Sequence, residues 1–193
     1  MHMSSAFSRE IDAELVERAR RGDMSAHRRL FEAFAPAVFT LARRLLRHAD
    51  VAEDVLQETF LDVMRRIGSY RGEAPFGFWL RQIAVNRCLM YLRAYWTQNV
   101  HAAEDGVIEA QAVHDRFLER VDVLSLLERL PPEGRAVLWL HEVEGYTHQE
   151  IGAMFGKTAS FSKSQLARSH ARLREMVMNE SSEVKACTPI PGN

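Results

Sequence analysis

Apolar residues recur at every third or fourth position along most of this chain, which is the spacing of one buried face of an α-helix. The pattern predicts two short amphipathic helices between Ile11 and Phe34, divided at Gly22, and Pro36 then suits the start of another helix. Further helical runs are expected at residues 38–46, 55–67 and 76–92. Together these segments predict a first helical domain at residues 9–96.

A second, smaller helical unit is expected after an interruption. Residues 97–117 carry too few apolar side chains to build a core, so they predict a flexible acidic linker. The second domain is expected at residues 118–178, and residues 179–193, which include two prolines, predict a frayed tail.

The second unit contains a helix-turn-helix pattern. Thr147 and Glu150 have the spacing of a capping box, and Gly156 suits the left-handed end of the short helix that the box begins. Small Gly152 permits a close helix crossing, and Ser160 can cap a long final helix. A basic second helix after such a turn is typical of proteins that insert it into the major groove.

The composition agrees with an all-α fold of two small domains. Apolar residues make up 47% of the chain and charged residues 26%, so a packed core can form. Only 10 glycines and 6 prolines occur among 193 residues, and apolar and polar positions rarely alternate, which argues against a β-sandwich or barrel. The two cysteines are far apart and no segment resembles a signal peptide or a membrane span, which favours a cytoplasmic protein without membrane insertion.

The net charge of −1 hides strong local charges. Residues 49–64 hold five acids and no Lys or Arg, whereas residues 65–93 hold six arginines and one acid. Residues 101–128 hold seven acids and two arginines, and residues 157–174 hold five cations and no acid. Alternating acidic and basic segments indicate several different partners.

The first acidic segment forms a stripe at helical spacing, with members Asp50, Glu53, Asp54, Gln57 and Glu58. Like charges four residues apart repel each other unless a basic partner compensates them, so a partner surface is one interpretation. Simple solvation together with a favourable helix dipole is the other.

Arginines and aromatic residues alternate between residues 70 and 96, a mixture that suits single-stranded nucleic acid. Phe76 and Trp79 lie on the apolar stripe and are assigned to the core, which leaves Tyr70, Asn86 and Arg87 as contact candidates. For the five cations of the last helix, the alternative to a DNA contact is a solvated charged face.

Several motifs carry a resemblance to a known family: Asp50-Val-Ala-Glu-Asp-Val-Leu-Gln-Glu-Thr-Phe60-Leu, Tyr70-Arg-Gly, Phe78-Trp-Leu, Ile83-Ala-Val-Asn-Arg-Cys88, Leu130-Pro131, Arg135, Glu144-Gly145 and Glu150-Ile151. The chain resembles bacterial RNA polymerase sigma factors of the extracytoplasmic-function (ECF) group of the sigma-70 family. The resemblance implies two helical domains, regions 2 and 4, that bind core RNA polymerase and direct it to promoter DNA by reading the −35 and −10 elements and stabilising strand opening.

The resemblance also implies roles for individual residues. The acidic stripe, above all Asp54, Gln57 and Glu58, would contact the clamp helices of the largest polymerase subunit. An unstacked base of the −10 element would be held by Tyr70, Arg71, Asn86 and Arg87. The −35 element would be read by Ser160, Phe161, Ser162, Lys163, Ser164, Gln165, Arg168 and Arg172. An anti-sigma protein is a further implied partner, although no residue identifies one.

The last helix departs from the family pattern, because Ser162 occupies the position of an apolar core residue and Phe161 lies one place earlier. Either the helix is rotated or Phe161 is exposed. These two alternatives place different residues at the DNA bases.

Two other functions compete with this interpretation. A helix-turn-helix regulator that does not bind polymerase explains the second domain and leaves the acidic stripe unexplained. A zinc enzyme would use His141 and His148, but no HExxH motif is present and Gly145 breaks the helix between them. We therefore expect no catalytic residue, no metal site and no cofactor.

Overall fold

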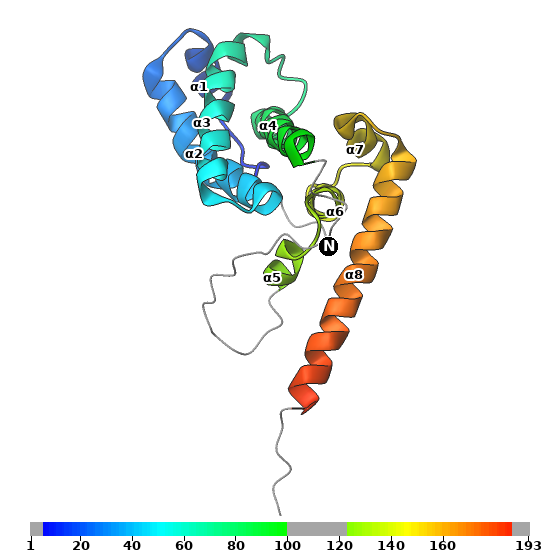
Figure 1. Cartoon of the computed structure of the whole chain (residues 1–193). Coiled ribbons are helices and arrows are strands. Elements are labelled where there is room, and N and C mark those ends of the chain that lie inside the picture. Colours follow the sequence, from blue (N-terminus) through cyan, green and yellow to red (C-terminus); the bar gives the residue numbers. More distant parts are fainter. Residues whose placement is uncertain (1–5, 100–122, 187–193) are drawn as a thin grey trace, which may run out of the picture.

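The computed structural model of the chain describes residues 6–99 and 123–186, with side chains for 6–94 and 124–179, and contains helices and no strand in these ranges (Figure 1). The all-α prediction is confirmed. The helices of the first domain are α1 (Ala13–Arg20), α2 (Met24–Leu46), α3 (Ala49–Arg66), the short 3-10 turn η1 (Ile67–Ser69) and α4 (Phe76–Asn99).

Local sequence signals set the starts of the first two helices. The Asp12 carboxylate accepts a hydrogen bond from the Glu14 backbone N–H at 2.9 Å and caps α1. Asp23 caps α2 in the same way, accepting from Ser25 N–H at 2.8 Å. Gly22, with a φ of 85°, makes the left-handed turn between them, as the sequence predicts.

The expected helix start at Pro36 is wrong, because Pro36 lies inside the 23-residue helix α2. Proline lacks the N–H that would bond to the carbonyl of Glu32, four residues earlier. Both residues are exposed, so water can satisfy that carbonyl. The apolar face continues without interruption on both sides of Pro36, which favours one long helix over two short ones.

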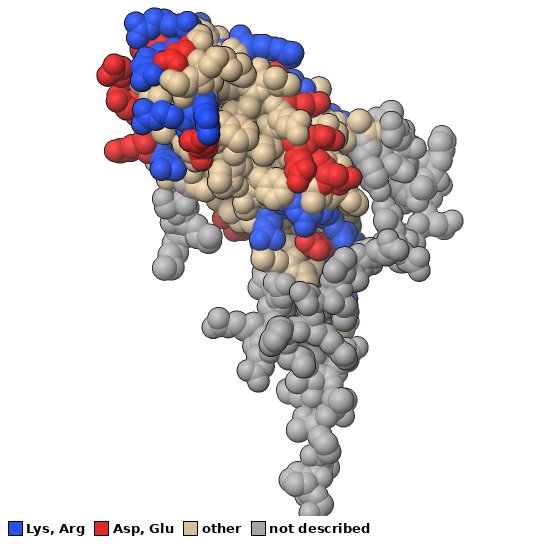
Figure 2. Space-filling model, turned by 90° about the vertical axis from the view of Figure 1, so that its left-hand side faces the viewer, with Lys and Arg blue, Asp and Glu red and all other residues tan. Residues whose placement is uncertain are grey.

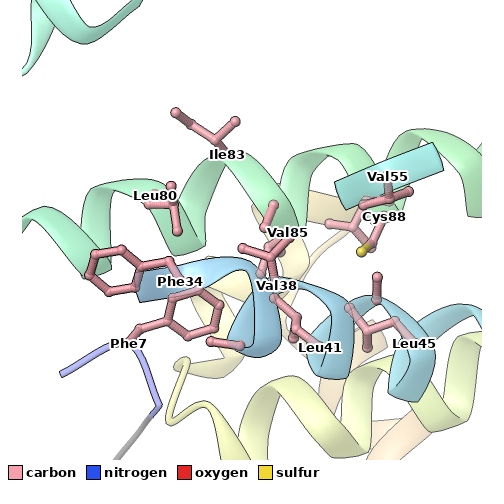
Figure 3. Close-up of a cluster of buried hydrophobic side chains, with 14 of the residues drawn as sticks. Phe7, Phe34, Val38, Leu41, Leu45, Val55, Leu80, Ile83, Val85 and Cys88 are labelled. Atoms are coloured by element: carbon pink, nitrogen blue, oxygen red, sulfur yellow. The ribbon is translucent and has the colours of Figure 1, made fainter. Parts of the chain in front are cut away.

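The core of the first domain lies between α2, α3 and α4 (Figure 3). Phe34, Val38 and Leu45 of α2 are fully buried and face apolar side chains of α4 and α3. Phe7, in the segment before α1, fills the end of this core. Its backbone approaches Gly77 so closely that a Cβ there would lie 1.9 Å from the Phe7 carbonyl oxygen.

The second domain consists of α5 (Val123–Glu128), α6 (Pro132–Leu138), the π-helical turn η2 (Trp139–Val143), α7 (His148–Phe155) and α8 (Ala159–Ala186). The capping box is confirmed: Thr147 Oγ1 accepts from Glu150 N–H at 3.2 Å, and Glu150 Oε2 accepts from Thr147 N–H at 2.8 Å. Gly156 ends α7 in the left-handed conformation, with a φ of 64°.

Three helix ends differ from expectation. Ser160 does not cap α8, since the helix begins at Ala159 and Thr158 Oγ1 accepts from Phe161 N–H at 3.4 Å. Helix α8 continues to Ala186, into the segment expected to be a frayed tail. At the other end, α4 runs to Asn99 and so includes the first residues of the expected linker; most of that linker lies outside the described residues.

The close crossing of α7 and α8 yields a stability prediction. A Cβ at Gly152 would lie 2.7 Å from the Thr158 carbonyl carbon. Gly152→Ala is therefore expected to lower the free energy of unfolding by about 1–3 kcal/mol, the usual cost of overpacking. Urea unfolding followed by circular dichroism measures this change.

Gly68→Ala is the matched control, because nothing lies within 4 Å of a Cβ at Gly68. A Gly152→Ala protein that unfolds at the same urea concentration as the Gly68→Ala protein would contradict the close crossing.

Candidate functional site

The acidic stripe lies on α3 and starts in the first turn of that helix. Four of its five members are exposed: Asp50, Glu53, Asp54 and Gln57. Figure 2 shows acidic side chains gathered in patches on this face of the molecule, with basic side chains beside them. The positive end of the α3 dipole stabilises the first carboxylates, but the pair Asp50 and Asp54 still repel each other four residues apart.

Two exposed apolar side chains extend this face of α3, and the sequence analysis missed them. Leu61 is 49% exposed and Met64 is 41% exposed. They follow Gln57 at positions i+4 and i+7, so they share its side of the helix. The sequence could have indicated this apolar contact, because Leu61 is apolar although its position falls on the polar face of the predicted helix.

Glu58, the fifth member of the stripe, is tied to α4. Arg87 donates from Nε and Nη2 to Asp62 Oδ2 at 2.8 and 2.5 Å, and its Nη1 lies 3.2 Å from Glu58 Oε2. The hydrogen bond to Asp62 raises the pKa of Arg87. Arg87, expected at the −10 element, therefore joins α4 to α3 in this structure.

A shallow pocket of about 290 Å³ lies beside this ion pair, which is small for a ligand pocket. Its lining residues are Asp62, Arg66, Ile83, Asn86, Arg87 and Met90. Asn86 is exposed, and its Oδ1 is 3.5 Å from Gln82 Nε2. Tyr70 and Arg71 do not line the pocket. Arg71 is exposed, with a Glu73 carboxylate 3.8 Å away.

Tyr70 is part of an aromatic cluster that holds the loop before α4. Its ring centroid lies 5.5 Å from those of Phe76 and Trp79. Its hydroxyl donates to the carbonyl of Ala74 at 2.6 Å. Partial burial raises the pKa of Tyr70. The structure thus gives Tyr70 a packing role at the loop, and it leaves Asn86 as the exposed −10 candidate that lines the pocket.

The second helix of the helix-turn-helix, α8, presents one exposed polar stripe. Its members, all expected at the −35 element, are Ser160, Lys163, Ser164, Arg168 and Arg172. The other three expected residues face the domain. Phe161 is half-buried with its ring 5.6 Å from that of Phe155, Ser162 is fully buried, and Gln165 donates to Glu133 Oε2 at 3.2 Å.

A chain of imidazole contacts explains how a serine fills the core position at Ser162. The buried Ser162 Oγ lies 3.0 Å from His148 Nδ1. The His148 ring stacks on that of His141, with centroids 4.2 Å apart. His141 Nδ1 in turn donates to the Tyr146 carbonyl at 2.9 Å. A buried hydroxyl requires such a partner, so α8 keeps Ser162 inward and Phe161 at the edge of the core.

The environment of His148 favours its neutral form. Burial lowers the pKa of His148, and the nearby His141 and Lys163 lower it further, against the opposing charge of Glu142. Within the described ranges, no three His, Cys, Asp or Glu side chains are grouped so that they could hold a metal ion.

Comparison with known proteins identifies the family. The family model described as Sigma-70 region 2 matches residues 30–98, and the model described as Sigma-70, region 4 matches residues 120–173. The RNA polymerase sigma factor CarQ of Myxococcus xanthus is 35% identical over 166 residues, which cover 84% of this chain and 95% of CarQ. The ECF RNA polymerase sigma factor SigM of Mycobacterium tuberculosis is 33% identical, with 86% of this chain and 84% of SigM covered. The chain is an ECF sigma factor.

This sigma factor therefore serves promoter-specific initiation of transcription. Solved structures share its fold. The sigma factor RpoE of Bartonella quintana, in complex with the anti-sigma factor NepR, has a TM-score of 0.55 at 23% identity and covers 78% of this chain and 96% of RpoE. CnrH, in complex with the cytosolic domain of CnrY, has a TM-score of 0.53 at 21% identity, covering 86% of this chain and 96% of CnrH.

In the described part of the sigma factor, none of the helices has the length and apolarity needed to cross a membrane.

The contact between His148 and Ser162 predicts a pH dependence. A base whose pKa is lower in the folded state than in the unfolded state binds fewer protons when folded, so the free energy of unfolding falls as the pH drops through about 6.5. His148→Gln keeps a hydrogen-bonding group beside Ser162 but does not titrate. We expect urea unfolding of this variant to depend less on pH between about 7.5 and 5.5 than that of the wild type.

His27→Gln is the control, since it also removes one histidine, on α2, from outside the second domain. Equal pH dependence in the His148→Gln and wild-type proteins would show that His148 does not have this role.

Proposed function

We propose that this sigma factor binds core RNA polymerase through the exposed face of α3, opens the −10 element with the Asn86 pocket and reads the −35 element with the polar stripe of α8. The observation that carries the proposal is the outward-facing acidic stripe on α3. A stand-alone DNA-binding regulator has no use for uncompensated carboxylates on its other domain, whereas a basic protein surface would offset their repulsion. Leu61 and Met64 add an apolar contact next to those charges.

The α8 stripe has the chemistry of a major-groove contact. The N-terminal part of a recognition helix meets base edges, and Lys163 can donate to the O6 and N7 acceptors of guanine. Arg168 and Arg172, further along the same exposed face, suit phosphates. Because Phe161, Ser162 and Gln165 face the domain, the proposal leaves base contacts to Ser160, Lys163 and Ser164, with Phe161, Ser162 and Gln165 positioning the helix.

The pocket at Asn86 suits a base that has left the stack. An amide side chain offers both a donor and an acceptor to a base edge, and Arg66 adds a positive charge at the same pocket. Binding to the unpaired strand shifts the equilibrium between closed and open duplex by differential affinity, so no nucleotide hydrolysis is required. The proposal accordingly assigns the sigma factor no catalytic residue and no cofactor, and places it in the cytoplasm with the polymerase.

A regulatory partner is the second part of the proposal. The sigma factor RpoE shares the fold and was solved with an anti-sigma factor bound. We propose that a protein of this kind controls the sigma factor described here.

The polymerase contact is tested by Asp54→Lys. Asp54 is exposed on the stripe, so its charge reversal should leave the fold intact and raise the dissociation constant for core RNA polymerase at least about tenfold, or 1.4 kcal/mol. Fluorescence anisotropy of labelled sigma factor titrated with core polymerase measures it. Glu14→Lys, the same charge change at an exposed position on α1, is the control. If the two variants bind equally well, the acidic stripe has no part in the contact.

The base pocket is tested by Asn86→Ala. Loss of the amide should reduce the fraction of open promoter complexes, by roughly tenfold for about 1.4 kcal/mol of lost binding, and change closed-complex affinity much less. Permanganate reactivity of unpaired thymines reports opening, and gel shift at low temperature reports closed complexes. Met90→Ala, which alters the same pocket without removing a hydrogen-bonding group, should have a smaller effect. Equal losses in both assays for Asn86→Ala would argue against a base pocket.

A further inference from the structure

A chain of polar side chains connects η2 and α7 to the inner side of α8. The ring of His141 in η2 stacks on that of His148 in α7, with centroids 4.2 Å apart and an angle of 19° between the planes. His148 Nδ1 lies 3.0 Å from Ser162 Oγ of α8. Ser162 has no exposed surface, and the opposite side of the same helical turns carries the exposed Ser160 and Ser164. His148 therefore holds the part of α8 from which the proposed −35 contacts project.

The hydrogen-bond partners assign the positions of the protons in this chain of contacts. A carbonyl oxygen only accepts, so His141 Nδ1 carries the hydrogen that it donates to the Tyr146 carbonyl at 2.9 Å. Among the described residues, the Ser162 hydroxyl has one hydrogen-bond partner, His148 Nδ1. A neutral imidazole with its hydrogen on Nε2 accepts at Nδ1, so the buried O–H group is satisfied. The contact is complete when His148 is neutral.

Protonation of His148 removes that acceptor. Both ring nitrogens of an imidazolium carry hydrogens, so Nδ1 can then only donate. The Ser162 O–H group stays in the core without an acceptor, and a buried donor in this state destabilises the conformation that contains it. The new positive charge also lies against the stacked His141 ring. Rotation of the first turns of α8 would return the Ser162 hydroxyl to water.

The groups around α7 also favour neutral His148. Burial lowers the pKa of His148, and the charges of His141 and Lys163 lower it further. Glu142 acts in the opposite direction, but its carboxylate also lies 3.5 Å from His170 Nε2. The titratable and charged groups that the elements packed against α7 bring to it are His141 and Glu142 of η2, Lys163 and His170 of α8, and Arg81 and Arg93 of α4. Most of these groups oppose a further positive charge at His148.

The contact between His148 and Ser162 affects how α8 can meet DNA. Lys163 follows Ser162 directly, and Ser160 and Ser164 lie on the same exposed side of the helix. Successive helix residues point about 100° apart, so a rotation that releases Ser162 also turns these three side chains away from the base edges they would meet. Attraction to phosphates depends on charge far more than on such placement. Protonation of His148 therefore reduces sequence discrimination, while the added charge favours DNA of any sequence.

We propose that His148 is a positioning residue for the −35 surface: the neutral imidazole holds Ser162 in the core and so sets the rotation of α8, and acid reduces −35 discrimination by removing that hold. This inference rests on the proposed function of the α8 stripe. The fraction of molecules with α8 correctly rotated falls when His148 is protonated. The apparent dissociation constant for the −35 element then rises as the inverse of that fraction. DNA without the element requires no particular rotation, so its binding does not follow this fraction.

The test compares two duplexes that differ only in the −35 block. One is the promoter duplex that the chain and core RNA polymerase together select from random DNA at about pH 7.5, and the other has that block scrambled. The ratio of their dissociation constants for the polymerase complex measures −35 discrimination. Effects of pH on the polymerase, on the −10 contact and on phosphate contacts are common to both duplexes and cancel. We expect the wild-type ratio to fall about threefold between about pH 7.5 and 5.5.

Two variants remove the titration in different ways. His148→Gln offers the Ser162 hydroxyl an acceptor that does not titrate, and Ser162→Ala removes the hydroxyl that needs one. In both variants the ratio should change by less than about 1.5-fold over the same pH range. His27→Gln is the control, since it removes a histidine of α2 and should keep the wild-type pH dependence.

A wild-type ratio that stays constant or rises on acidification would overturn the role of His148, as would a ratio that falls in either variant as it does in the wild type. A loss of far-ultraviolet circular dichroism that matches the fall of the wild-type ratio would also overturn it, because unfolding would then explain the result. A wild-type ratio near one at about pH 7.5 has a separate meaning, since it contradicts the proposed −35 function itself.

Discussion

The rest of the structure depends on the buried face of α2. This helix packs against α1, α3, α4 and α6, and therefore touches both domains. Its apolar side chains fix α3 and α4 from the inside, so the opposite sides of those helices are free to carry the acidic stripe and the Asn86 pocket. The last turn of the same helix supplies the Leu45 carbonyl to Arg135. Packing in one element thus sets the positions of the two proposed binding surfaces and of one contact between the domains.

In the second domain, small and polar residues determine how α7 and α8 pack and which side of α8 faces outward. Gly152 lets α7 and α8 cross closely, and Ser162 turns inward because His148 offers it a hydrogen bond. With Ser162 inside and Phe161 against Phe155, the opposite side of α8 is left with hydroxyls and cations. The departure from the family pattern at these positions is therefore compatible with an outward-facing recognition stripe, because a polar contact replaces an apolar one at the same place in the core.

Much of the fold could be predicted from the sequence, because its signals are local. Helical periodicity, the Thr147 capping box and the left-handed turn at Gly156 each act within a few residues. The helix start expected at Pro36 was wrong. Packing of the apolar face on both sides of the proline outweighs the preference of proline for the first turn of a helix. The acidic stripe could be predicted as a pattern, and its resemblance to sigma factors gave the family that the comparisons confirm.

The remaining features depend on contacts between residues far apart in the chain. Glu58 and Arg87 belonged to separate candidate sites in the sequence, yet they form an ion pair. The contact of Phe7 with Gly77 and that of Arg81 with Glu144 join segments with no shared periodicity. No local pattern shows which side of α8 faces inward, because the answer depends on His148 in another helix. The individual site roles of Asn86 and of the α8 stripe stay predictions.

The central claim is that one chain gives polymerase two separate DNA-reading surfaces. The most direct measurement mixes the wild-type chain with core RNA polymerase and random-sequence duplexes, recovers the bound DNA and sequences it. The account predicts two enriched blocks of sequence at a fixed separation of about 25 base pairs between centres, and no such enrichment with core polymerase alone. A single enriched block, or the same DNA with and without the chain, would contradict it.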